Sequence, residues 1–137
     1  MTYIFDACAL IAYLNEEKGE GFEKVDELLS KAEAGEITIY MNIVNLVEVY
    51  YGYIGDCGVT IADEIMRPVF GFPMQIVSNI TNDIYRETAR FKGIYPLSLA
   101  DAFLCGTAKS LSATIVTKDG EIAGPEGEER LPVLWIK

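Results

Sequence analysis

The sequence contains no histidine, and only three of its 137 residues are cysteines. Without an imidazole, the chain cannot supply a histidine base, a Ser-His pair or a histidine-ligated zinc. The cysteines Cys8, Cys57 and Cys105 are odd in number and have no CxxC spacing, so neither a disulfide framework nor a zinc ribbon is expected. We therefore expect reduced thiols, as in a cytoplasmic protein.

Basic side chains are also scarce, because 11 lysines and arginines stand against 21 acidic residues and the formal net charge is −10. This charge balance argues against a protein that binds duplex nucleic acid by neutralising many phosphates. An enzyme that touches nucleic acid through a metal ion remains compatible with it. The sequence has no apolar run of about 20 residues and no basic, apolar leader, so neither a membrane span nor a signal peptide is expected.

Short, apolar, β-favouring runs alternate with helical patterns along the whole chain, and we expect residues 1–137 to form one domain. Strands are predicted over Thr2–Phe5, Ile37–Tyr40, Met74–Val77, Ala113–Thr117 and Val133–Ile136. Helices are predicted over residues 7–14, 20–34, 43–53, 60–69, 82–92 and 99–112, and an acidic Gly/Pro loop over residues 120–130. The alternation predicts an α/β fold, with a parallel sheet of about five strands and helices on both faces.

Some acidic residues stand where carboxylates are unusual. In a parallel sheet covered by helices, a ligand lies beyond the carboxyl ends of the strands. Asp6 closes the first predicted strand and Asp119 lies just past the fourth, so both are expected at the same edge. Glu48 and Asp101 stand within apolar helical stretches. A carboxylate in such surroundings is protonated, pairs with a cation or binds a metal.

Structural explanations also exist for the three acids in apolar surroundings. Asp6 could cap the helix that follows it, and Glu48 could be solvated on a helix whose other face is buried. Asp101 could be the second member of a capping box that begins at Ser98. However, no lysine or arginine stands three or four residues from any of these acids. Converging carboxylates without cations need a divalent ion, and oxygen ligands select a hard one, Mg²⁺ or Mn²⁺.

Four segments together resemble a PIN domain, and most of all the VapC-type ribonuclease toxins. They are residues 4–11 (IFDACALI), 48–52 (EVYYG), 98–103 (SLADAF) and 115–119 (IVTKD). The resemblance implies a single PIN-like α/β domain with an acidic pocket that binds one or two Mg²⁺ or Mn²⁺ ions. By motif position, the catalytic and metal-binding acids would be Asp6, Glu48, Asp101 and Asp119. Thr117 takes the family's Ser/Thr position before the last acid, and Asn45 and Glu121 are candidate accessory residues.

The resemblance also implies an activity, which is hydrolysis of RNA phosphodiesters by a metal-activated water without histidine. Asp6 and Asp101 are expected to hold the principal ion, and Glu48 and Asp119 to orient the water or a second ion. The expected product ends are a 5′-phosphate and a 3′-hydroxyl. The expected partners are an RNA substrate, a small antitoxin protein and a second copy of the chain, in the cytoplasm and without a membrane.

Two other functions remain open from the sequence, namely a catalytically silent PIN-like module that binds protein and a metal-dependent phosphatase for small phosphoesters. The role of the basic residues is open as well. Arg86 and Arg90 stand four residues apart on one predicted helix and could contact RNA phosphates. The alternative, which is the more common role of such residues, is that they pair with Asp83 and Glu87 on the same helix.

Overall fold

Five parallel strands form one sheet in the computed structural model, which describes residues 1–16 and 19–136. They are β1 (Thr2–Phe5), β2 (Thr38–Asn42), β3 (Gln75–Val77), β4 (Thr114–Thr117) and β5 (Val133–Trp135). Their order is β3-β2-β1-β4-β5, and Ile4 of β1 lies opposite Tyr40 on one side and Ile115 on the other. All five predicted strands are confirmed. The strand order reverses direction at β1, so the carboxyl end of β1 is the place where such sheets bind ligands.

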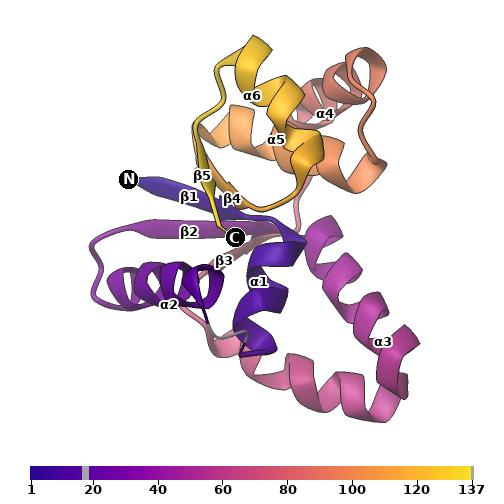
Figure 1. Ribbon diagram of the computed structural model, residues 1–137. Coiled ribbons are helices and arrows are strands. Elements are labelled where there is room, and N and C mark those ends of the chain that lie inside the picture. The colour runs from indigo at the N-terminus through magenta and orange to yellow at the C-terminus, as the bar shows by residue number, and fades with distance from the viewer. Residues whose placement is uncertain (17–18, 137) are drawn as a thin grey trace.

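Helices cover both faces of the sheet, as predicted. They are α1 (Ala7–Leu14), α2 (Glu20–Glu33), α3 (Ile43–Met66), α4 (Asn82–Ile94), α5 (Leu99–Leu111) and α6 (Ala123–Glu129). In Figure 1, α1, α2 and α3 lie below the sheet and α4, α5 and α6 lie above it. Phe5 belongs to the apolar cluster between the sheet and helices α1, α2 and α3. Its neighbour Ile4 belongs to the cluster between the sheet and the helices on the opposite face. Alternate residues of the central strand therefore fill two cores, one on each face.

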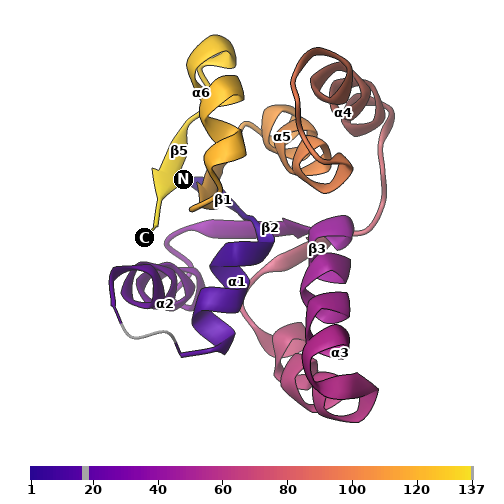
Figure 2. The same ribbon diagram turned by 45° about the vertical axis from the view of Figure 1, so that its right-hand side comes forward.

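The long helix α3 bends at Gly58, whose φ of 83° and ψ of 166° are not helical. Glycine tolerates this conformation because it has no Cβ. Figures 1 and 2 show α3 running away from the sheet and then turning back. The two helices predicted over residues 43–53 and 60–69 are thus present as the two arms of α3. They are separated by the bend at Gly58 and not by the longer loop that was predicted. The second arm ends at Met66, and a 3₁₀ turn, η1 (Arg67–Gly71), replaces its predicted end.

The prediction of a loop over residues 120–130 is wrong. This segment forms a 3₁₀ turn, η2 (Gly120–Ile122), followed directly by α6. Pro125 is compatible with a helix because it lies in the first turn, where a missing backbone N–H breaks no helical hydrogen bond. Ile122 and Pro125 are buried, so tertiary packing holds a segment whose glycines and acids alone favour a loop.

Helices α4 and α5 pack against each other without a side chain at Gly106. A Cβ built on Gly106 would lie 2.3 Å from Thr88 Oγ1 and 2.7 Å from the Thr88 backbone nitrogen. Only glycine allows so close an approach. None of the helices described for this chain has the length and apolar character that a bilayer span requires.

Candidate active site

Asp6 lies at the carboxyl end of the central strand, where β1 turns into α1. Its Oδ1 accepts a hydrogen bond from the Ala7 backbone N–H at 2.7 Å, so it caps α1. Its Oδ2 accepts the Thr117 hydroxyl, also at 2.7 Å, and the side chain is only 3% exposed. The capping interpretation is therefore correct but incomplete, because Asp6 uses one oxygen for the helix and keeps the other in the site.

Thr117 ends β4, the neighbour of β1, and connects two of the predicted acids. Besides donating to Asp6, its hydroxyl oxygen accepts the backbone N–H of Asp119 at 2.9 Å. Asp119 in turn caps η2, with Oδ1 accepting the Glu121 backbone N–H at 3.0 Å. The carboxyl ends of β1 and β4 thus bring Asp6 and Asp119 to one edge of the sheet, as predicted.

Asp101 comes from the first turn of α5 and completes a cluster of three acids. Carboxylate oxygens of Asp6, Asp101 and Asp119 lie within 4.8 Å of one another. The Asp101 backbone N–H donates to Ser98 Oγ at 3.1 Å, which is one half of a capping box. The other half is supplied by Glu121, whose Oε1 accepts the Ser98 backbone N–H at 3.3 Å. Because Glu121 takes this task, the Asp101 carboxyl is not used for capping and lies in the cluster.

Glu48 lies at the margin of the cluster, on the first arm of α3. It is partly buried, and the charges of Asp6 and Asp119 both act on it. Its Oε1 accepts a hydrogen bond from Asn45 Nδ2 at 3.2 Å. The structure therefore brings three of the four predicted acids within mutual reach and places the fourth beside them.

Burial is the main influence on the pKa values of Asp6, Glu48 and Asp101. It raises the pKa of Asp101 to about 9, with further contributions from neighbouring carboxyl groups. Burial also raises the pKa of Asp6 and of Glu48, although hydrogen bonds from Thr117 and Asn45 partly oppose it. Ionising all of these groups together is therefore unfavourable unless a positive ion compensates their charge.

The donor set fits a hard dication such as Mg²⁺ or Mn²⁺, since the clustered ligand atoms are all carboxylate oxygens.

A role for Cys8 was not predicted, although it stands only two residues after Asp6. Its Sγ lies 3.5 Å from Asp6 Oδ2 and 3.4 Å from Thr117 Oγ1. Burial, together with the Asp6 charge, raises the pKa of the Cys8 thiol to about 12, so it remains a neutral thiol and offers no soft thiolate ligand.

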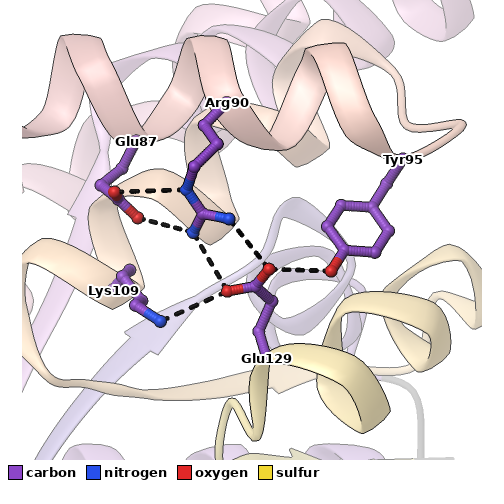
Figure 3. A network of polar contacts seen from close by, with 5 residues as sticks. All are labelled: Glu87, Arg90, Tyr95, Lys109 and Glu129. Atoms are coloured by element: carbon purple, nitrogen blue, oxygen red, sulfur yellow. Dashed lines mark hydrogen bonds and ion pairs between the residues drawn. The ribbon is translucent and has the colours of Figure 1, made fainter.

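Arg90 is engaged inside the molecule, in the network of Figure 3. Its Nη2 lies 2.8 Å from Glu87 Oε2, and its Nη1 lies 2.9 Å from Glu129 Oε2. Glu129 also accepts the Tyr95 hydroxyl at 2.8 Å and pairs with Lys109 at 3.3 Å. For Arg90 the ion-pair interpretation is confirmed, and the network ties α6 to α4 and α5.

Comparison with known proteins gives one family and a set of similar folds. The model of the PIN domain family matches residues 3–126. VapBC2 from Rickettsia felis, solved with a DNA fragment from its promoter, aligns over 100% of both chains with a TM-score of 0.75 and 15% identity. A toxin–antitoxin complex from Klebsiella pneumoniae aligns over 96% of this chain and 95% of that one, with a TM-score of 0.65 and 22% identity.

A third similar structure is VapC20 from Mycobacterium tuberculosis, a toxin that cleaves the sarcin-ricin loop. It aligns over 90% of this chain and 94% of its own, with a TM-score of 0.67 and 12% identity. No curated protein sequence matches the chain. At these identities, the solved structures establish a common fold.

Proposed function

Because this chain belongs to the PIN domain family, we propose that it is a metal-dependent endoribonuclease and the toxin of a toxin–antitoxin pair. The observation that carries the proposal is the convergence of Asp6, Asp101 and Asp119, which come from separate elements and place oxygens within 4.8 Å of one another. Solved structures of similar fold that come from toxin–antitoxin pairs support the toxin role.

The ion would be Mg²⁺ or Mn²⁺, held by Asp6, Asp101 and Asp119. When bound, such an ion supplies Lewis acidity that lowers the pKa of a water and offsets charge on a phosphodiester. Thr117 fixes two of the three acids through its hydroxyl. We assign to Glu48 the task of orienting the attacking water and accepting its proton, since Asn45 holds one of its oxygens beside the cluster. Attack by water on phosphorus, with cleavage of the P–O3′ bond and protonation of the leaving 3′-oxygen, would leave a 5′-phosphate on one fragment and a 3′-hydroxyl on the other.

The proposed substrate is RNA, bound in single-stranded or looped regions. A net charge of −10 gives weak capture by phosphate neutralisation, so shape and the metal site would supply most of the recognition. The proposed antitoxin would place an arginine or lysine among the carboxylates, where a charge-assisted hydrogen bond compensates them as a dication would. Such a pair would act in the cytoplasm.

We also propose a homodimer. Large apolar side chains remain exposed on α3, α4 and η1, among them Tyr51 (61%), Tyr85 (64%) and Phe70 (71%). A contiguous apolar patch is typical of protein interfaces, and Val47, Met66 and Phe70 of α3 and η1 line one groove of this surface. Sedimentation of the purified chain over a range of concentrations measures whether two copies associate, and a monomer at high micromolar concentration would contradict the dimer.

Calorimetric titration with Mn²⁺ and an RNA cleavage assay test the nuclease proposal on the wild type and on Asp101→Asn. We expect the wild type to bind Mn²⁺ and to cleave structured RNA only when Mg²⁺ or Mn²⁺ is present. Asp101→Asn should lose both properties, because an amide replaces a ligand carboxylate. Asp26→Asn, an exposed acid on α2, is the matched control and should keep both.

Two outcomes would overturn the nuclease assignment. Failure of the wild type to bind Mn²⁺ would favour a silent protein-binding module. Hydrolysis of a generic phosphate monoester, without cleavage of RNA, would favour a phosphatase.

A further inference from the structure

Asn45 lies in the first turn of α3, in contact with α5, and has no exposed surface although its side chain is polar. Its Nδ2 donates one hydrogen bond to Glu48 Oε1 at 3.2 Å and another to the Ala100 carbonyl oxygen at 3.1 Å. Ala100 directly precedes Asp101 in α5. A single amide group therefore joins the Glu48 side chain to the backbone that carries Asp101.

The orientation of the Asn45 amide follows from its partners. Both neighbours are acceptors, so the reverse orientation would bring the Asn45 oxygen against two other oxygens. In the orientation present, Oδ1 is buried and has no hydrogen-bond partner among the described residues. An unpaired buried oxygen lowers stability, and an apolar side chain of similar size would avoid this loss. Stability alone therefore does not explain an amide at this position.

Asn42 joins the same two helices in a different way. Its Oδ1 accepts the Val44 backbone N–H at 2.8 Å and caps α3, while its Nδ2 donates to Thr107 Oγ1 of α5 at 2.8 Å. Asn42 is fully buried, like Asn45. Within the described part of the chain, the side-chain hydrogen bonds of Asn42 reach Val44 and Thr107 and no site carboxylate. Asn42 and Asn45 thus both link α3 to α5, and it is Asn45 that contacts a site carboxylate.

We propose that Asn45 is a positioning residue, which holds Glu48 beside the carboxylate cluster and fixes it relative to Asp101. The charges of Asp6 and Asp119 act on Glu48 and repel its carboxylate. Without the Asn45 amide, Glu48 would turn outward into solvent, because its side chain has several rotatable bonds and its carboxylate has no other hydrogen bond among the described residues. This inference rests on the proposed function, since the position of Glu48 matters only if the cluster binds a dication.

The test is a cycle of variants with Mn²⁺ affinity, measured by calorimetry well below the unfolding temperature, as the main readout. Asn45→Leu removes both hydrogen bonds at similar volume, and we expect Mn²⁺ affinity to fall about tenfold. We expect kcat for RNA cleavage to fall while KM changes little. In a Glu48→Ala background, Asn45→Leu should lower Mn²⁺ affinity no further, because Asn45 acts through Glu48.

Asn42→Ser is the matched control, since serine still caps α3 but does not reach Thr107. It should lower the unfolding temperature and leave Mn²⁺ affinity within about threefold of the wild type, because no site carboxylate loses a partner. If Asn45→Leu does not fold, Asn45→Ser, which keeps a hydroxyl donor, replaces it and should show a smaller loss of affinity in the same direction.

The outcomes separate the inference from the proposed function. Wild-type affinity in the Asn45 variant, or the same loss with and without Glu48, would overturn the positioning role. Equal losses of affinity in the Asn42 and Asn45 variants would assign both residues to helix packing alone. A wild type that binds no Mn²⁺ would overturn the proposed function itself, and the positioning role with it.

Discussion

At the scale of single residues, the Thr117 hydroxyl supports two acids at once. Thr117→Val keeps the shape of the side chain but removes the hydrogen bonds to Asp6 and from the Asp119 backbone. We expect Mn²⁺ affinity to fall about 10- to 100-fold and the free energy of unfolding to fall by about 1–3 kcal/mol. Calorimetry and urea unfolding measure the two effects. Thr117→Ser keeps the hydroxyl and should retain most of the affinity, so an equal loss in both variants would contradict this role.

Asp101 gives the metal-free protein a predictable pH dependence. Burial raises its pKa from 3.8 to about 9, so the folded state binds the proton more tightly than the unfolded state does. Between these two values, unfolding releases a proton, and stability therefore falls as the pH rises. Urea unfolding in a chelator at pH 5, 7 and 9 should show this decrease. Asp101→Asn should reduce the slope, and an unchanged slope would show that Asp101 is not its source.

At the scale of secondary-structure elements, Glu129 fixes α6 to its neighbours (Figure 3). Hydrogen bonds from Arg90 are the main cause that lowers the pKa of Glu129 to about 2. The ionised form therefore stabilises the fold above the ordinary carboxyl pKa of about 4.5, and this contribution is lost as the pH falls toward 2. We expect Glu129→Gln to lower the free energy of unfolding by about 1–3 kcal/mol at pH 7.

Urea unfolding from pH 7 down to pH 3 measures this difference, which should shrink below pH 4.5. Glu64→Gln changes an exposed acid on α3 and should leave stability nearly unchanged at every pH. A difference between Glu129→Gln and the wild type that stays constant down to pH 3 would contradict the ion-pair explanation.

The close contact between α4 and α5 depends on glycine at position 106, which has no side chain. Gly106→Ala would place a Cβ 2.3 Å from Thr88 Oγ1 and close to the Thr88 backbone, so the helices must separate. We expect a loss of about 1–3 kcal/mol in the free energy of unfolding. Gly93→Ala in α4 meets no atom within 4 Å and should instead be neutral or stabilise by up to about 1 kcal/mol. Thermal and urea unfolding of both variants compare them directly.

The elements themselves were largely predictable from the sequence, and their mutual contacts were not. The strand from Thr2 to Phe5 has the apolar run of a fully buried strand, and the Asn42, Thr81 and Ser98 caps mark where helices begin. The helix of residues 123–129 escaped prediction because its glycines and acids favour a loop. It is held by Glu129, whose partner Arg90 stands 39 positions away. No local pattern encodes a contact at that separation.

The same limit applies to the site. A strand that ends in an acid is visible in sequence, so Asp6 and Asp119 could be assigned to one edge of the sheet. The task of Glu121 could not be predicted, because the residue stands 23 positions from Ser98, whose backbone N–H its Oε1 accepts. This contact frees the Asp101 carboxyl from the capping box. The link between Asn45 and Ala100, 55 positions apart, was equally invisible.

At the scale of the whole molecule, metal removal should be a stability measurement as well as an activity measurement. The folded chain gathers the three clustered acids, whereas the unfolded chain separates them. A ligand that binds the folded state alone adds about 2.7 kcal/mol at 100 times its dissociation constant. We therefore expect Mg²⁺ to raise the unfolding temperature and EDTA to reverse the rise, as scanning calorimetry measures. Asp101→Asn should abolish the response, and a full response in that variant would contradict the assigned ligands.

The sheet order has a consequence for how the chain is made. Asp6 follows the first strand, but its partner Thr117 ends β4, which pairs directly with β1. During translation, the first strand must wait until Asp101 and Asp119 have been synthesised before the three acids can meet. A nascent chain that has not yet reached Asp119 lacks one of the three clustered acids. The proposed cleaving activity would then arise only after Asp119, the last of the three acids in the sequence, has left the ribosome and the sheet has formed.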